Sequence, residues 1–229
     1  MDYKTIMVFG AHPDDELTMS GTMVKLAHAG VRVVVVQMTD GSEGYPRPEM
    51  RETIVAVRRE EAEAANKVIG IARRVCINSP DMGLVNDKAT LKKCIQAIRE
   101  ERPDAIFTQG PDDYHRDHIN THYISVDARW HAGEPVAAEL GPSWKTPHLY
   151  YYKGISRREL PAITIDISTT AHKRPEALAT QVSQHALFRR TKEEFLADAA
   201  RIKSSGQRYT ETFWIAERNP LSDFLPRGL

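Results

Sequence analysis

The chain alternates short runs of β-branched and other apolar residues with longer segments in which apolar residues recur at helical spacing. This alternation is typical of parallel βαβ units, because parallel strands need a long crossover connection that is usually a helix. We therefore expect an α/β protein, namely a three-layer α/β/α sandwich around a mostly parallel, Rossmann-like sheet. The predicted strands are residues 5–11, 31–38, 74–78, 105–109, 148–153 and 162–167, and the predicted helices are residues 16–29, 49–69, 88–101 and 119–128.

The length of 229 residues suits one large domain, and no internal repeat, low-complexity tract or shift in composition marks a second. We expect a single domain over residues 1–229. Residues 133–147 contain Gly, Pro and Ser without periodicity, which predicts a surface loop and suggests a lid. A C-terminal extension over residues 169–229 is expected to contain helices at 170–186 and 191–204 and a strand at 211–216.

The charge balance gives no reason to expect a generally basic surface, and it leaves a local basic patch open. Lys and Arg number 31 and Asp and Glu number 31, so the whole chain has no general attraction to nucleic acid or to an anionic membrane. No apolar run approaches the length of a membrane span, and no export signal is visible. We expect a cytoplasmic protein that binds neither nucleic acid nor membrane. The two cysteines, Cys76 and Cys94, are expected to be reduced and buried.

The first polar cluster of interest, His12-Pro13-Asp14-Asp15-Glu16, follows directly on the apolar run at residues 6–11. A histidine and a carboxylate three residues apart can both turn toward one cation where the chain bends from a strand into a helix. Consecutive residues at a helix start project about 100° apart, so only one of the two aspartates can share that direction. The other is free to handle a proton. The alternative is that both aspartates only cap the following helix.

A second polar cluster, at residues 112–118, also follows an apolar strand directly. In open parallel sheets, ligands bind beyond the carboxyl ends of strands where the strand order reverses, and the first and fourth strands are commonly adjacent there. Such a sheet brings His12, Asp15 and His118 around one point. Two imidazoles and one carboxylate with an open position are the ligand set of a catalytic metal site. Alone, the second cluster would be read as a solvated loop.

These residues resemble the LmbE-like, or PIG-L-type, zinc-dependent de-N-acetylases. The resemblance rests on the Ala-His-Pro-Asp-Asp-Glu segment at residues 11–16 and the His-x-Asp-His segment at residues 115–118. Further similarity lies in Thr39-Asp40-Gly41, in Arg58-x-x-Glu61-Ala62 followed by Gly70, and in Ser183-Gln184. The sequence is most similar to deacetylases of diacetylchitobiose or of N-acetylglucosamine conjugates. It departs from the family at Gln181, where relatives often carry His, and at Ser20, where they carry Gly.

The resemblance implies a role for each matching residue. His12, Asp15 and His118 would bind Zn²⁺, or another divalent transition metal such as Fe²⁺. Asp14 would be the general base and His115 the electrophilic partner of the substrate carbonyl. Two further roles carry over: Asp117 would lie beside His115 and tune it, and Arg58 would contact the sugar part of the substrate. The family also implies a homo-oligomer, a trimer or a hexamer.

The expected function is a zinc-dependent hydrolase that removes an acetyl group from an N-acetylated amino sugar or its conjugate, using metal-activated water. The alternative on the same scaffold is a metal-dependent hydratase of a small unsaturated acid. A non-haem iron oxygenase and a non-catalytic binding module are less compatible with the α/β pattern and with an unligated Asp14. Three features are left open: whether Tyr114 donates to the oxyanion or packs, whether Gln181 contributes, and how loops 45–51 and 133–147 select the substrate.

Overall fold

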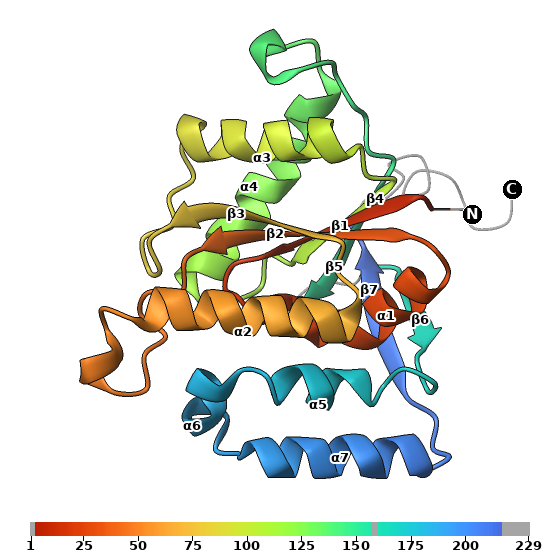
Figure 1. The fold of residues 1–229 in the computed structure, drawn as a ribbon. Coiled ribbons are helices and arrows are strands. Elements are labelled where there is room, and N and C mark those ends of the chain that lie inside the picture. Colours follow the sequence, from red (N-terminus) through yellow and green to blue (C-terminus); the bar gives the residue numbers. More distant parts are fainter. Residues whose placement is uncertain (1–2, 157–159, 217–229) are drawn as a thin grey trace, which may run out of the picture.

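The computed structural model describes residues 3–156 and 160–216, and its centre is one sheet with the strand order β3-β2-β1-β4-β5-β7-β6 (Figure 1). Strands β1 to β5 are parallel to one another, whereas β7 is antiparallel to both β5 and β6. The mostly parallel sheet that the sequence predicts is confirmed. The strands are β1 Thr5–Gly10, β2 Arg32–Thr39, β3 Arg73–Ser79, β4 Ala105–Gln109, β5 His148–Lys153, β6 Ala162–Asp166 and β7 Thr210–Ile215.

Helices cover both faces of the sheet, as a three-layer sandwich requires. One face carries α3 and α4, and the other carries α1, α2 and α5, with α7 packed outside α5 (Figure 1). The side chains of β1 alternate between the two cores: Ile6 and Val8 belong to one and Met7 and Phe9 to the other. The helices are α1 Ser20–His28, α2 Ile54–Ile69, α3 Lys88–Glu101, α4 Arg116–Gly133, α5 Lys173–Leu178, α6 His185–Phe188 and α7 Lys192–Ser204.

Most predicted strand ends are correct to within one residue, but four helices differ from the prediction. The helix predicted at 119–128 is longer at both ends and forms α4, Arg116–Gly133. The first predicted helix begins as a 3₁₀ turn, Asp15–Met19, before α1. The second begins only at Ile54, because Pro48–Met50 forms a separate 3₁₀ turn. The predicted helix at 170–186 is broken, since the 3₁₀ turn Val182–Gln184 separates α5 from α6. The strand predicted near 211–216 is confirmed as β7, while residues 217–229 of the expected extension lie outside the described residues.

The loop at residues 133–147 is not a lid over the carboxyl ends of the strands. Helix α4 starts beyond the carboxyl end of β4 and is 18 residues long, which is about 27 Å. The loop that follows it therefore lies near the amino ends of the strands, where β5 begins. The buried guanidinium of Arg99 in α3 holds it there by donating to six carbonyl oxygens. The acceptors are the carbonyls of His131, Ala132, Glu134, Val136, Ala137 and Gly141.

The two cysteines differ, which corrects the expectation that both are buried. Cys94 is fully buried in α3, and burial raises the pKa of its thiol to about 12. Cys76 is exposed, because β3 is an edge strand with only β2 beside it. Among the described residues, no helix is long and apolar enough to cross a membrane.

Candidate functional site

The two polar clusters meet at the carboxyl ends of β1 and β4, which are neighbouring strands at the point where the strand order reverses. His12 Nδ1 lies 3.3 Å from His118 Nε2, although the two residues are 106 positions apart in the sequence. One carboxylate oxygen of Asp15, Oδ2, lies 3.4 Å from His12 Nδ1. The other, Oδ1, lies 3.4 Å from His118 Nε2. The structure therefore brings together the three side chains that the sequence analysis grouped as metal ligands.

The spacing of these atoms suits a tetrahedral metal ion. Zinc bonds of about 2.0–2.1 Å in tetrahedral geometry place neighbouring ligand atoms about 3.3–3.4 Å apart. Ligand atoms of His12, His115 and His118 also lie within 4.8 Å of one another, as do those of His12, Asp81 and Asp117. We favour the set with Asp15, because this carboxylate contacts both imidazoles. In addition, His115 Nδ1 already accepts a hydrogen bond from the backbone N–H of Asp117, at 3.2 Å.

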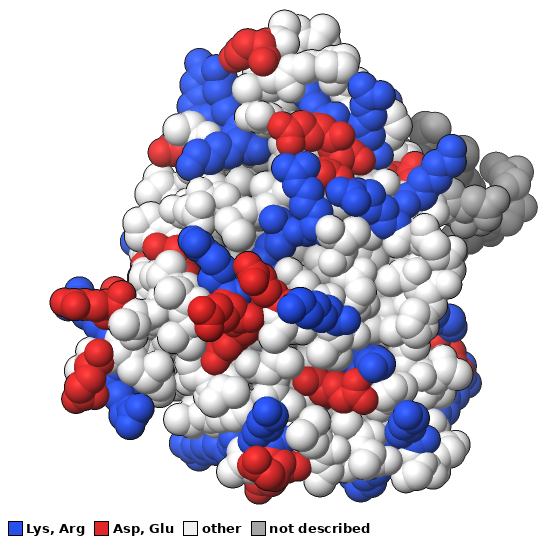
Figure 2. Space-filling model, viewed as in Figure 1, with Lys and Arg blue, Asp and Glu red and all other residues white. Residues whose placement is uncertain are grey.

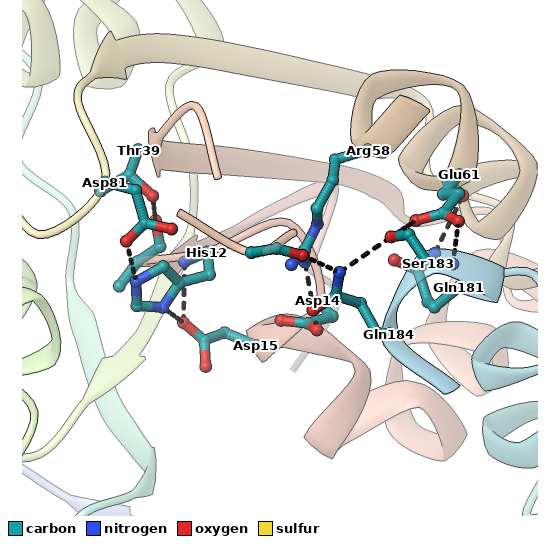
Figure 3. A network of polar contacts seen from close by, with 12 residues as sticks. His12, Asp14, Asp15, Thr39, Arg58, Glu61, Asp81, Gln181, Ser183 and Gln184 are labelled. Atoms are coloured by element: carbon teal, nitrogen blue, oxygen red, sulfur yellow. Dashed lines mark hydrogen bonds and ion pairs between the residues drawn. The ribbon is translucent and has the colours of Figure 1, made fainter. Parts of the chain in front are cut away.

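Carboxylates behind the two imidazoles orient them. His12 Nε2 lies 3.1 Å from Asp81 Oδ1 and 3.5 Å from Asp117 Oδ2, which leaves Nδ1 facing His118 (Figure 3). His118 Nδ1 lies 2.9 Å from Asp113 Oδ2, which leaves Nε2 facing His12. A carboxylate on the outer nitrogen is the usual partner of a metal-binding histidine. Both rings therefore present the inner nitrogen to the same point.

The surroundings of His12 favour positive charge. Burial alone would lower the pKa of this imidazole, but the carboxylates of Asp117, Asp15 and Asp81 outweigh burial and raise its pKa to about 11. Asp15 is 8% exposed, and although burial disfavours its ionised form, His12, Lys153 and His118 hold its pKa well below the ordinary value. A point that stabilises a cation this strongly, with nitrogen and oxygen donors around it, fits a divalent metal ion.

Asp81 and Asp113 were not among the predicted site residues. Asp113 stands within the second polar cluster, so its position was a usable signal. Asp81 comes soon after β3, and its only signal was that it follows the carboxyl end of another parallel strand. Its Oδ1 also accepts a hydrogen bond from the backbone N–H of Met82, a residue at the positive φ of 61°. The backbone therefore turns sharply at Met82, next to the residue that contacts His12.

The position of Asp117 corrects the expected contact with His115. Its side chain is fully buried, and Oδ2 accepts a hydrogen bond of 2.7 Å from the backbone N–H of Met82 and faces His12. Only its backbone N–H contacts the His115 ring. The carboxylate points inward because it lies in the first turn of α4, one residue after the exposed Arg116. The carboxylate of Asp117 therefore faces His12, while its backbone N–H faces His115.

Asp14 is the aspartate that stays outside the three-ligand cluster. It precedes the 3₁₀ turn, but its side chain makes no capping hydrogen bond, which excludes the alternative that it serves only as a cap. Instead its Oδ2 lies 3.1 Å from Nη2 of Arg58, whose side chain is 4% exposed (Figure 3). The predicted direct contact between Arg58 and a substrate stays a prediction, whereas its contact with Asp14 is present in the structure.

A hydrogen-bond network lies beside Arg58 and explains two of the supporting motifs (Figure 3). Gly44 lies so close to Arg58 that a Cβ there would be 2.6 Å from Nη1. The carbonyl of Gly44 accepts a hydrogen bond of 2.7 Å from Gln184 Nε2. Ser183 donates to the Glu61 carboxylate through its backbone N–H, at 2.6 Å, and through its hydroxyl, at 2.7 Å. The Arg58-x-x-Glu61 and Ser183-Gln184 motifs therefore form one brace beside Asp14.

Two residues that the sequence analysis left open do not line the cluster. Gln181 is fully buried, and its Nε2 donates to the carbonyl of Glu61 at 3.0 Å, so it braces α2. Tyr114 is 98% exposed, so it does not pack against the protein.

Lys153, at the end of β5, contacts the cluster although it was not predicted to do so. Its ammonium forms an ion pair with Asp15 Oδ1.

The amino-acid sequence and the fold are similar to those of known deacetylases. The PIG-L family, described as GlcNAc-PI de-N-acetylase, matches residues 7–129. The diacetylchitobiose deacetylase of Thermococcus kodakarensis is 28% identical over 194 residues, which cover 80% of this chain and 71% of that protein. A 1D-myo-inositol 2-acetamido-2-deoxy-alpha-D-glucopyranoside deacetylase of Catenulispora acidiphila is 30% identical over 63% of this chain, but over only 57% of its own length.

Solved structures show the same arrangement of the whole chain. The N,N'-diacetylchitobiose deacetylase from Pyrococcus horikoshii superposes with a TM-score of 0.80 at 25% identity, covering 98% of this chain and 90% of that chain. A 4-carboxy-2-hydroxymuconate hydratase from Pseudomonas putida superposes with a TM-score of 0.77 and covers 99% of both chains. Its identity of 21% means that this second likeness concerns the fold alone.

Proposed function

The chain belongs to the PIG-L family of GlcNAc-PI de-N-acetylases, and on this premise we propose that it is a metal-dependent hydrolase that removes the acetyl group from an N-acetylated amino sugar or its conjugate. The observation that carries the proposal is the convergence of three side chains, His12, Asp15 and His118, through contacts of 3.3–3.4 Å, beside the carboxylate of Asp14. Relatives named as deacetylases of acetamido sugars support the substrate class.

His12, Asp15 and His118 are the residues that we propose to hold the metal ion. Two nitrogen donors and one carboxylate suit Zn²⁺, and Fe²⁺ is compatible with the same donors. When bound, such an ion polarises an amide carbonyl and lowers the pKa of water from 15.7 toward about 7. Asp81 and Asp113 keep the two imidazoles in the required orientation by binding their outer nitrogens.

The remaining side chains supply the proton transfers. Asp14 accepts the proton that water loses as it attacks the amide carbonyl, and Arg58 fixes the direction of that carboxylate. His115 accepts a hydrogen bond on Nδ1, so the neutral ring carries its proton on Nε2 and can donate it to the oxyanion that forms. Asp14 then returns its proton to the amine nitrogen as the C–N bond breaks. The products are acetate and a free amino sugar.

The hydratase alternative rests on the shared scaffold alone, because the named hydratase is similar to this chain only in fold. It would need a proton delivered to carbon instead of nitrogen, and its products would contain no acetate. Acetate release therefore distinguishes the two reactions directly.

Two wider expectations belong to the same proposal. We propose that the protein is cytoplasmic, and that it forms a trimer or a hexamer as the family resemblance implies. Light scattering coupled to size-exclusion chromatography measures the second directly, and a monomer at micromolar concentration would contradict it.

The test is a panel of N-acetylated substrates with acetate detection, run on metal-loaded and on chelated protein. The panel contains N-acetylglucosamine, diacetylchitobiose and an inositol-linked N-acetylglucosamine. We expect Asp14→Ala to retain metal and lose turnover, and His12→Ala to lose both. The exposed His28 provides a control, since His28→Ala should change neither. Metal retained in His12→Ala, or no acetate from any substrate, would overturn the proposal.

A further inference from the structure

Lys153 is the basic side chain in contact with the proposed metal ligands. Its Nζ forms an ion pair with Asp15 Oδ1, the same oxygen that lies 3.4 Å from His118 Nε2. The lysine side chain is 24% exposed and the aspartate side chain 8% exposed. The ammonium therefore belongs to a side chain that is less buried than Asp15, and it contacts the oxygen that faces His118.

The backbone fixes Lys153 in this position. The pairing of β5 with β4 shifts register, so that Thr108 pairs with Tyr151 and Gln109 with Lys153, and Tyr152 is the additional residue. Such a bulge changes the direction in which the following side chain points, and bulges are common next to active sites. Tyr152 uses its own hydroxyl to donate a 2.9 Å hydrogen bond to the carbonyl of Phe9, at the end of β1.

Two glycines hold the segments that follow β4 and β5 together. The backbone N–H of Gly110 donates to the carbonyl of Lys153 at 2.7 Å, and that of Asp112 donates to the carbonyl of Gly154 at 2.8 Å. A Cβ on Gly110 would lie 2.5 Å from the carbonyl oxygen of Gly154. Because the two chains touch here, Lys153 and the loop that carries Asp113 are held as one unit.

A carboxylate that is paired with an ammonium binds a divalent cation less tightly, because like charges at such distances repel in a partly buried site. We propose that Lys153 is a positioning residue that competes with the metal ion for Asp15. It keeps this carboxylate paired and oriented when no cation is bound, and it lowers the affinity of the site for metal, so that the metal exchanges readily. The inference rests on the proposed function, because it takes His12, Asp15 and His118 as the ligands.

The test compares metal affinity in charge-neutral variants. Lys153→Met keeps the length of the side chain and removes its charge, and Lys153→Gln is a second neutral variant in case the first fails to fold. The zinc dissociation constant is measured by competition with a chelator, and we expect it to fall by about 10- to 100-fold in both variants, because a repelling positive charge is removed. The matched control is Lys173→Met, which removes a lysine of 30% exposure from an ion pair with Glu176 and should leave the constant unchanged.

A second measurement separates competition from a purely structural role. If Lys153 competes with metal, its removal should lower the Tm of the chelated protein more than that of the zinc-loaded protein, so the rise in Tm on adding zinc becomes larger than in the wild type. A structural role alone would lower both values equally. Lys153→Arg, which keeps the charge, should behave as the wild type in both measurements.

The outcomes distinguish this inference from the proposed activity. Equal or weaker zinc binding in the neutral variants, with normal binding in the wild type, would overturn the role of Lys153 alone. A wild type that takes up no more zinc than His12→Ala would overturn both the ligand assignment and this inference. Zinc uptake that depends on His12, together with no acetate release from any substrate, would overturn the activity and leave the role of Lys153 to be decided by the dissociation constants.

Discussion

Nη2 of Arg58 in α2 lies 3.1 Å from Oδ2 of Asp14, a residue in the turn after β1. The arginine side chain is 4% exposed and the aspartate side chain 20% exposed, so the pair forms a wall of the site with its carboxylate still accessible. The ion pair with the buried side chain of Arg58 restricts the rotation of the Asp14 carboxylate. Among the described contacts, this pair connects the proposed proton acceptor to the brace built by Glu61, Ser183 and Gln184 (Figure 3).

We predict that Arg58→Met lowers kcat/KM for acetate release by about 100-fold or more while metal content stays normal, because misorienting a catalytic group by about 1 Å has effects of that size. Steady-state kinetics and metal analysis on the same samples check this. The exposed neighbour Arg59 provides the control, since Arg59→Met should retain activity. Loss of metal in Arg58→Met would show that the arginine supports the ligands and not Asp14.

The sequence predicted the fold and the meeting of the two motifs because each depends on local signals. The apolar runs, the polar residues at their ends and the usual adjacency of the first and fourth strands were sufficient to bring His12 and His118 together. The contacts of Asp81 and Lys153 could not be predicted in this way. They come from the ends of β3 and β5, and their reach depends on a positive φ at Met82 and on a register shift in β5.

The errors have the same origin. The family resemblance implied that Asp117 lies beside His115 and tunes it, but the first turn of α4 directs its carboxylate toward His12. Cys76 was expected in the interior because its strand is apolar, but strand order places β3 at an edge. In both cases the decisive information was the position of another element, which no local pattern contains.

We predict that Arg99→Met lowers the free energy of unfolding by about 3 kcal/mol or more, because six carbonyl oxygens lose a buried charged donor. Chemical denaturation measures the change. Lys92→Ala, which breaks an exposed ion pair with Glu139, is the control and should cost less than about 1 kcal/mol. The loop at 133–141 lies near the amino ends of the strands, whereas the site lies at their carboxyl ends. Folded Arg99→Met should therefore keep the KM of the wild type. A raised KM would indicate that the loop reaches the substrate.

We predict that Gly110→Ala destabilises the protein by about 1–3 kcal/mol and weakens metal binding, because a Cβ meets the carbonyl oxygen of Gly154 at 2.5 Å and pushes the loop that carries Asp113 away from His118. Denaturation and chelator competition report the two effects. Gly133→Ala is the control: its Cβ would have no neighbour closer than 3.6 Å, and it lies in α4, where alanine is the better helix former. If Gly110→Ala binds metal as tightly as the wild type, contact between the two loops does not position Asp113.

Glu101 at the end of α3 makes the stability of the protein depend on pH, at a position remote from the proposed metal ligands. Burial would raise the pKa of Glu101, but hydrogen bonds and charge from Arg32 and Arg73 outweigh burial and hold its pKa below the ordinary value of 4.5. A lowered pKa means that the folded state prefers the ionised carboxylate. The stabilisation is therefore complete above about pH 4.5 and is lost as pH falls through the lowered pKa.

Glu101→Gln should lower the free energy of unfolding at pH 7 by about 1 kcal/mol, a modest value because both arginines are nearly half exposed and solvent screens the pairs. The difference from the wild type should shrink as pH falls below 4.5, since the wild-type carboxylate then becomes protonated as well. Denaturation at a series of pH values measures it. The control is Glu100→Gln, which removes a carboxylate of 43% exposure at 3.4 Å from Arg73 and should have a smaller effect. A difference that stays constant down to pH 3 would mean that the charge of Glu101 contributes nothing to stability.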